Sequence, residues 1–341
     1  MSDTGKKIIL LTVAVVFSLG AVELVLRVIG YGVITPEMNF GVNTQQALDR
    51  GRFMPDPDLF WKLPTSPLDV DFRAVQPDVP VPPKGSKRRI LVMGDSCSRL
   101  STAIPPYSVL LEDSLRAHDV EVYNAAVPGY TTWQGRAWLK KQLFALEPDL
   151  VVVYYGWNDH WRATGITDRD YAKRLSSSAP RLGLLFRKMP DPPPLRVPVD
   201  DYRANLLAIV EDLEEADIKT TLVAAPSNLT QEARSRILQT RYLVRGDDAG
   251  AIHQQYLDVV REVCGKTDAT LLDAAAAFAA ARAPRQLLMR DGIHLTDLGH
   301  QLMAALLADH LTSDLGGGGP RPDTSAQAQR ARDFIHAEGS R

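Results

Sequence analysis

Three residues in two distant parts of the sequence have the types that serine-based acyl transfer requires. Ser96 ends the tripeptide Gly-Asp-Ser at 94–96, and Asp291 precedes His294 by three positions. Acyl transfer through a covalent intermediate needs a hydroxyl nucleophile, a base that takes its proton and a group that orients the base. We therefore expect Ser96 as the nucleophile, His294 as the base and Asp291 as the orienting acid.

The same chemistry needs hydrogen-bond donors for the negative charge that develops on the substrate oxygen. The backbone N–H groups of Ser96 and Gly129 and the side-chain amide of Asn158 are the candidates for this oxyanion hole. Two alternatives stay open. Asp159, not Asn158, could face the site, and Gly129 could serve backbone geometry alone after Pro128.

Alternating apolar runs and helical stretches position these motifs. Strands are predicted at 89–94, 120–125, 149–156, 219–226 and 269–274, and helices at 107–118, 132–147, 201–217, 228–244, 250–265 and 296–311 with Thr296 as N-cap. This alternation predicts an α/β sandwich with a parallel sheet. Sites in such sheets form at the carboxyl ends of the strands, where the motifs are expected to meet.

Taken together, these motifs resemble the SGNH (GDSL) hydrolase superfamily of esterases and lipases. The resemblance covers about residues 88–312 and rests on the order of the motifs, their strand contexts and the Asp-x-x-His spacing. It implies a flavodoxin-like, three-layer αβα sandwich with a five-stranded, mainly parallel sheet. The residues that it carries over as the family's Ser, Gly, Asn, His and Asp are Ser96, Gly129, Asn158, His294 and Asp291.

Two neighbouring residues invite other interpretations. Cys97 departs from the residue that many family members carry there, and we interpret it as a buried thiol, with nucleophile as the alternative. His160 either lines the pocket or lies at the surface. The stretch after Ser96 lacks the second glycine of a nucleophile elbow, which argues against an α/β-hydrolase fold.

The N-terminal segment is apolar over 8–30 and would be roughly 34 Å long as a helix, enough to cross a bilayer. Lys6 and Lys7 precede it, which predicts a cytoplasmic stub at 1–7 and a catalytic domain in the periplasm or outside the cell. The alternatives are a signal peptide cleaved after Ser18-Leu19-Gly20 and a soluble amphipathic helix.

The predicted catalytic domain spans 88–313, between two segments of different composition. Residues 31–87 are rich in proline, so no helix of useful length is expected there. Large apolar residues nevertheless predict an ordered extension at 53–73, and FMPDPDLFWK (53–62) is similar to an extension of membrane-anchored bacterial family members. Residues 74–87 are predicted to be an extended connector, 176–200 a rim or lid, and 314–341 a flexible tail with a marginal helix.

Composition narrows the function further. A net charge of −2 gives no general electrostatic attraction to nucleic acid, and two cysteines with no metal-ligand spacing indicate neither a disulfide framework nor a metal site. No cofactor is expected. The prediction is a membrane-anchored serine esterase for short-chain acyl or acetyl esters, whose substrate is an acylated glycan or lipid. The rivals are an O-acyltransferase acting on envelope glycans and a catalytically silent binding domain.

Overall fold

A parallel five-stranded sheet forms the centre of the protein. The computed structural model describes residues 2–29, 42–65, 73–76, 79–163, 165–175, 181–186, 190–240, 242–281, 284–316 and 320–338. The strands lie in the order β4-β3-β5-β6-β7 and all pair in parallel. Their bounds are β3 (Arg88–Gly94), β4 (Val120–Asn124), β5 (Leu150–Tyr154), β6 (Lys219–Val223) and β7 (Thr270–Leu272). The predicted sheet is confirmed.

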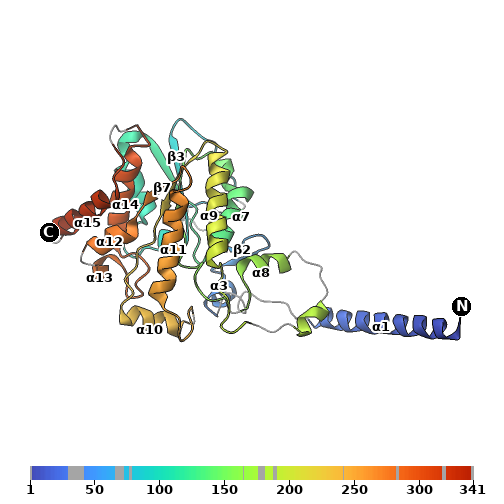
Figure 1. Ribbon diagram of the computed structural model, residues 1–341. Helices are drawn as coiled ribbons and strands as arrows, with labels where there is room; N and C mark the ends of the chain where they lie inside the picture. The colour runs from blue at the N-terminus through green and yellow to red at the C-terminus, as the bar shows by residue number, and fades with distance from the viewer. Residues whose placement is uncertain are drawn as a thin grey trace.

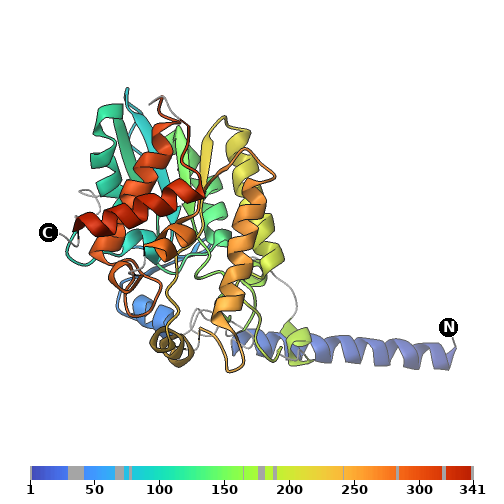
Figure 2. The ribbon, with the colours of Figure 1, turned by 60° about the vertical axis from the view of Figure 1, so that its left-hand side comes forward.

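Helices cover both faces of the sheet, as expected for crossover connections between parallel strands. One face carries α7 (Thr132–Lys141), α9 (Val199–Glu214) and α11 (Ala249–Cys264), and the opposite face carries α6 (Tyr107–Ser114) and α14 (Asp297–Thr312). Figure 2 shows α9 and α11 side by side, apart from α14. All five residues of β5 are buried, which explains its uninterrupted apolar run.

The strand order places the loops of interest next to each other. The chain moves from β3 outward to β4 and then returns past β3 to β5. The loops after β3 and β5 therefore diverge in opposite directions and leave a crevice at the carboxyl ends of these two strands. Ser96 follows β3 and Asn158 follows β5, so both lie at this crevice.

Several short helices were not predicted from the sequence. They are α5 (Ser96–Arg99), α8 (Asp168–Leu175), α12 (Ala274–Ala280) and α13 (Pro284–Leu287). The helix predicted at 228–244 is shorter, α10 (Gln231–Gln239). Two other predicted helices end early and continue as 3₁₀ turns, Arg116–His118 and Leu143–Leu146, which close on left-handed residues at Asp119 and Glu147. Thr296 caps α14 as predicted, accepting from Gly299 N at 3.1 Å.

The N-terminal extension packs on the α/β domain. A short hairpin joins β1 (Met54–Asp56) and β2 (Phe60–Lys62), and its Trp61 side chain is fully buried. The expectation of no useful helix in 31–87 was wrong, because α3 (Val42–Asp49) forms in a stretch without proline. The part of the predicted extension at 66–72 lies outside the described residues.

The connector after the extension is fixed by a buried arginine. Arg89 on β3 donates to the carbonyl oxygens of Pro82 and Pro83, at 3.0 and 2.7 Å, and to that of Leu146 at 2.9 Å. The first two of these bonds satisfy carbonyl groups of the proline-rich connector. Residues 77–78 of the connector lie outside the described part of the chain.

The C-terminal region differs from the flexible tail expected over 314–341. Helix α15 (Thr324–Glu338) packs against α12. Ala331 is fully buried, and Gln327 Oε1 accepts a hydrogen bond from Asp273 N at 3.0 Å. The marginal helix is therefore stabilised by tertiary contacts that its sequence does not reveal.

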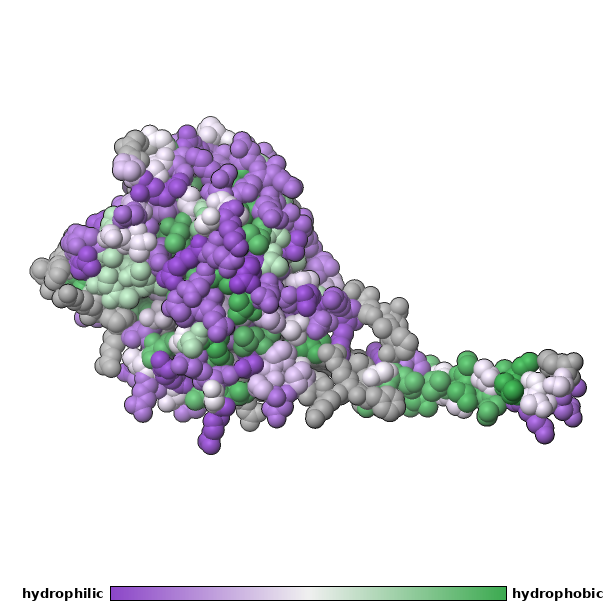
Figure 3. All heavy atoms as spheres, in the orientation of Figure 1, coloured by the Kyte–Doolittle hydropathy of each residue, from purple (hydrophilic) through white to green (hydrophobic). Residues whose placement is uncertain are grey.

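One helix, α1 (Asp3–Val28), is long and apolar enough to be a membrane span or a signal sequence. It projects from the α/β domain in Figure 1 and forms the exposed green rod in Figure 3. Its C-terminal end meets the 3₁₀ helix Arg181–Phe186, where Leu182 N donates to Glu23 Oε2 at 2.9 Å. This part of the predicted lid therefore contacts α1; residues 176–180 and 187–189 are outside the described range.

Candidate functional site

Ser96 begins a short helix directly at the end of a central strand. Asp95 is the N-cap of α5, and its Oδ1 accepts from Cys97 N at 2.8 Å. The turn is tight: a Cβ at Gly94 would lie 2.5 Å from Ser98 Oγ and 2.9 Å from Tyr154 O. Only glycine fits there, so the Gly-Asp-Ser order has a steric and a capping reason.

A chain of hydrogen bonds links the three residues proposed for acyl transfer. His294 Nδ1 donates to Asp291 Oδ2 at 2.7 Å, and Ser96 Oγ donates to His294 Nε2 at 2.8 Å. Asp291 Oδ1 also accepts from the backbone N–H groups of Ile293 and His294, at 2.9 and 3.1 Å. These backbone bonds hold the carboxylate in the loop before α14 and so fix the orientation of the imidazole.

The surroundings of His294 raise the pKa of its imidazole. Burial alone would lower the pKa of His294, but the hydrogen bond and charge of Asp291, together with the charge of Asp95, outweigh it and raise the pKa above its usual value. Burial would likewise raise the pKa of Asp291, but the contact with His294 and the two backbone donors lower it. An ionised Asp291 can therefore stabilise the cation that His294 becomes when it takes a proton.

Asp95 is a residue whose role the sequence did not reveal. Its Oδ2 accepts from Asn158 Nδ2 at 2.9 Å, so it joins the loop after β3 to the loop after β5. Complete burial raises its pKa to about 6, against hydrogen bonds from Cys97 and Asn158 and the charge of His294. Its place inside the Gly-Asp-Ser tripeptide was the only available signal.

Gly129 sits at the third position of a type II turn over 127–130. Tyr130 N donates to Val127 O at 3.1 Å, Pro128 occupies the second position, and Gly129 has φ +83°. This conformation favours glycine. Among the described residues, neither Gly129 N nor Ser96 N has a protein acceptor. Both N–H groups can therefore donate to a bound oxyanion.

The side chains of Asn158 and its neighbour Asp159 point in different directions. Asn158 Nδ2 lies 2.9 Å from Asp95 Oδ2 and 3.1 Å from Tyr130 O, at the carboxyl ends of β5 and β3. Asp159 is fully buried and accepts from Thr132 N at 2.9 Å, at the start of α7. Burial raises the pKa of Asp159 to about 7 despite its bonds from Thr132. Asp159 thus faces the base of α7, and Asn158 faces Asp95.

Cys97 and His160 are both internal. Cys97 is 1% exposed, as the buried-thiol interpretation requires, and burial raises its pKa well above the usual value. His160 is also fully buried, so neither the pocket nor the surface interpretation was right. It packs edge-on against Trp157 and Trp161, and its Nε2 lies 3.2 Å from His253 Nδ1. This aromatic cluster lies directly behind the loop that carries Asn158.

Comparison with known proteins assigns the chain to a family. Residues 92–302 match the sequence profile of the GDSL-like Lipase/Acylhydrolase family, which is more than half of the chain. The chain belongs to this family. Its fold and sequence thus make the protein an SGNH-type ester hydrolase.

The individual proteins that the chain resembles are distant in sequence. A GDSL esterase/lipase of Arabidopsis thaliana is 23% identical over 225 residues, 64% of this chain and 77% of that protein. A lipase/acylhydrolase from Enterococcus faecalis is 22% identical, with a TM-score of 0.48 over 69% of this chain and 100% of its own. The acetylxylan esterase Axe2 of Geobacillus stearothermophilus is 22% identical, with a TM-score of 0.45 over 68% of this chain and 95% of its own.

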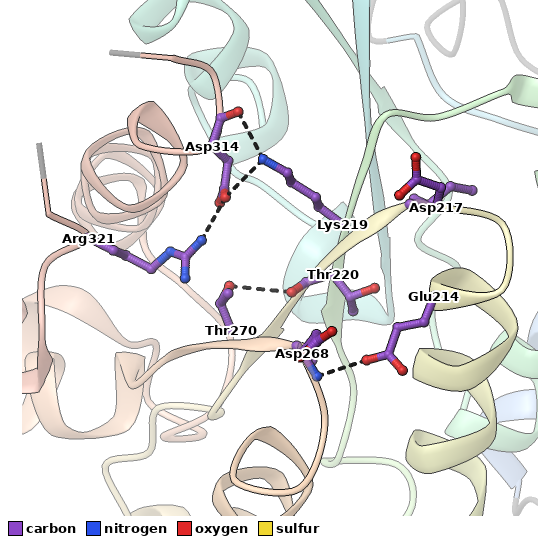
Figure 4. A pocket seen from close by; sticks show the side chains of 10 residues that line it. Glu214, Asp217, Lys219, Thr220, Asp268, Thr270, Asp314 and Arg321 are labelled. Carbon is purple, nitrogen blue, oxygen red and sulfur yellow. Dashed lines mark hydrogen bonds and ion pairs between the residues drawn. The ribbon is translucent and has the colours of Figure 1, made fainter. Parts of the chain in front are cut away.

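A separate pocket lies at the opposite end of the strands, around the amino ends of β6 and β7 (Figure 4). Its two basic side chains are both paired with Asp314, whose Oδ1 accepts from Arg321 at 2.7 Å and from Lys219 at 3.5 Å. Because Ser96 lies at the carboxyl ends of the strands, this pocket is not part of the esterase site. The described residues also contain no cluster of three or more His, Cys, Asp or Glu that would hold a metal ion.

Proposed function

We propose that this GDSL hydrolase is a serine esterase that cleaves short-chain acyl or acetyl esters through an acyl-enzyme. The observation that carries the proposal is the hydrogen-bond chain from Ser96 Oγ through His294 to Asp291. The neighbouring free N–H groups of Ser96 and Gly129 support it, because a hydroxyl nucleophile needs donors for the oxyanion beside it.

In the first step, His294 Nε2 takes the proton of Ser96 Oγ as this oxygen bonds to the ester carbonyl carbon. The carbonyl oxygen becomes an oxyanion and accepts from the N–H groups of Ser96 and Gly129. Asn158 adds a third donor once one of its two present contacts, with Asp95 or Tyr130 O, gives way to the oxyanion. His294 then protonates the leaving alcohol, and the acyl group stays on Ser96.

In the second step, His294 removes a proton from water, which attacks the acyl carbon. Collapse of the second oxyanion breaks the bond to Ser96 Oγ, and His294 returns the proton to this oxygen. The products are the free acid and the regenerated enzyme. Throughout, Asp291 holds Nδ1 of His294 protonated and opposes the positive charge of the imidazolium.

The surroundings of the Asp291 loop favour a hydrophilic substrate. A pocket lined by Asn228, Thr230, Gln231, Glu232, Leu288, Met289 and Arg290 borders this loop. Its polar side chains suit the hydroxyl groups of an acylated glycan better than a lipid chain, since a long acyl chain requires an apolar channel.

The direct test is hydrolysis of a p-nitrophenyl ester panel by the full-length protein, together with labelling by a fluorophosphonate probe. We expect turnover to be fastest for acetate and to fall as the acyl chain lengthens. Added sugar acceptors should not divert the acyl group; formation of acylated sugar would favour the O-acyltransferase. Neither turnover nor labelling would favour a catalytically silent domain and contradict the proposal.

The pH dependence follows from the raised pKa of His294. The base acts only when neutral, so kcat/KM should fall as pH drops through this pKa, which lies above the ordinary histidine value near 6.5. Asp291→Asn removes the larger of the two influences that raise the pKa of His294 and leaves burial, which lowers it, opposed only by the charge of Asp95. We therefore expect the acid limb of the Asp291→Asn profile to move to lower pH while the plateau falls. A limb that stays in place would contradict the proposed role of Asp291.

The membrane prediction concerns α1. We expect the full-length protein to stay with membranes in high salt and alkaline carbonate, because apolar burial in a bilayer is not screened by salt. Deletion of residues 1–30 should release a soluble, active enzyme, and protease added outside the inner membrane should reach the catalytic domain. Sequencing the mature N-terminus is the control. A start at Ala21 with soluble enzyme would replace the anchor with a cleaved signal peptide.

A further inference from the structure

The turn that carries Gly129 is held by a tryptophan from the N-terminal extension. Trp61 Nε1 on β2 donates to Pro128 O at 3.2 Å, and the Tyr130 hydroxyl donates to Trp61 O at 2.6 Å. The indole also covers the turn: a Cβ at Gly129 would lie 3.0 Å from Trp61 Cζ2. The Trp61 side chain is fully buried against this turn. Trp61 lies outside residues 92–302, the part of the chain that matches the family.

The next carbonyl of the turn is held by Arg196. Its Nη1 donates to Gly129 O at 2.8 Å, and its Nη2 donates to the buried carboxylate of Asp168 at 2.8 Å. The guanidinium also lies 5.7 Å from the centre of a Trp61 ring. Because the pair with Asp168 is almost completely buried, the guanidinium has a fixed position from which it restrains the carbonyl.

These contacts act on the peptide unit that supplies the oxyanion donor. Pro128 C=O and Gly129 N–H belong to one planar trans peptide, so they point in opposite directions. A donor that fixes the direction of Pro128 O therefore fixes the direction of Gly129 N–H. In a turn, this central peptide can rotate with little movement of its neighbours, since type I and type II turns differ mainly in its orientation.

Building on the proposed function, we propose that Trp61 is a positioning residue of the esterase site. Its indole N–H holds the Pro128–Gly129 peptide so that Gly129 N–H points toward the oxyanion, and Arg196 fixes the peptide that follows. Preorganised donors lower the barrier because they need no reorientation during the reaction. The hairpin of the extension, β1 and β2, is then a functional part of the active site.

The kinetic test is Trp61→Phe in the full-length protein, which removes the indole N–H and keeps an aromatic ring. We expect kcat for p-nitrophenyl acetate to fall about tenfold, the rate equivalent of one neutral hydrogen bond, while KM changes less than about twofold. The matched control is Trp138→Phe. Trp138 is equally buried, and its indole N–H donates to Gln142 Oε1 at the same 3.2 Å, not to the Pro128–Gly129 peptide. Its ring packs edge-on against Tyr130, and phenylalanine keeps an aromatic ring at this contact. The kcat of Trp138→Phe should remain at the wild-type level.

A second measurement does not depend on activity. Pro-Gly occurs once in the sequence, at 128–129, so ¹³C′-proline and ¹⁵N-glycine labelling gives one amide signal for this peptide. We expect a single sharp signal in the wild type and in Trp138→Phe. In Trp61→Phe the signal should broaden through exchange between two peptide orientations, and relaxation dispersion should detect it.

A failure of the positioning role of Trp61 can be distinguished from a failure of the proposed esterase function. Unchanged dispersion in Trp61→Phe overturns the positioning role, even if the wild type proves inactive on every ester. Wild-type kcat in Trp61→Phe also overturns it, and a rise in KM with constant kcat assigns Trp61 to substrate binding. Equal losses in Trp61→Phe and Trp138→Phe, without dispersion, would indicate a general packing effect and reject the proposal.

Discussion

Replacing Ser96 with alanine is expected to abolish ester hydrolysis and fluorophosphonate labelling while the fold persists. Ser96 Oγ is the only atom lost, and its partner is His294 Nε2 at 2.8 Å, at the end of a rigid central strand. Removal of the nucleophile from such a chain lowers kcat by about a millionfold in serine hydrolases. Turnover of p-nitrophenyl acetate and thermal unfolding, measured on the same preparation, would check both parts of the expectation.

Two neighbouring residues provide the controls. Ser98→Ala removes a hydroxyl of the same type two positions away, where it pairs with the Tyr107 hydroxyl at 2.8 Å. Cys97→Ala removes the buried thiol. We expect both variants to keep most of the activity, although each can lower the melting temperature through lost packing or hydrogen bonding. An active Ser96→Ala with an inactive Cys97→Ala would assign the nucleophile to Cys97 instead.

Replacing His294 with alanine should cost nearly as much as removing Ser96. Without the imidazole, no group in contact with Ser96 Oγ takes its proton, since His294 Nε2 is the partner observed there. The expected loss in kcat is again about a millionfold, and Asp291→Asn should lose less, about 10⁴-fold, because Asp291 only assists the base. Single-turnover kinetics would separate loss of acylation from loss of deacylation.

The control for this variant is His118→Ala, which removes an imidazole from the turn before β4, at the amino ends of the strands and so at the other end from Ser96. It should retain full activity. If His294→Ala were less impaired than Asp291→Asn, the aspartate would be acting directly on the substrate or on Ser96. The proposed order of the hydrogen-bond chain would then be wrong.

The sequence was sufficient for the sheet and for the residues of the proposed site. Strand runs such as 149–156 are continuous and apolar because both faces of a parallel strand are buried. The loops that follow parallel strands meet at one edge, so the motifs at 94–96 and 158 had to lie close together. The Asp-x-x-His spacing is local, and one turn of chain brings Asp291 and His294 into contact.

Contacts between distant segments could not be predicted from sequence. Helix α15 is weak by composition, and only its packing against α12 makes it a stable element. The choice between Asn158 and Asp159 depended on which side chain points toward Asp95, and adjacent loop residues give no periodic signal of direction. His160 looked like a candidate for the pocket, but it lies in an aromatic cluster built from separate helices and loops.

The sequence by itself determined which groups we propose for the chemistry: a hydroxyl, an imidazole, a carboxylate and an amide, each placed after a strand or before a helix. Only the tertiary structure decided how the proposed oxyanion donor Gly129 N–H is held. Trp61 lies 67 residues before Pro128, outside the range that matches the family, and donates to its carbonyl oxygen. Arg196 lies 67 residues after Gly129 and donates to the carbonyl oxygen of that residue. No local spacing encodes such contacts, because they arise when separately formed elements pack around the same peptide.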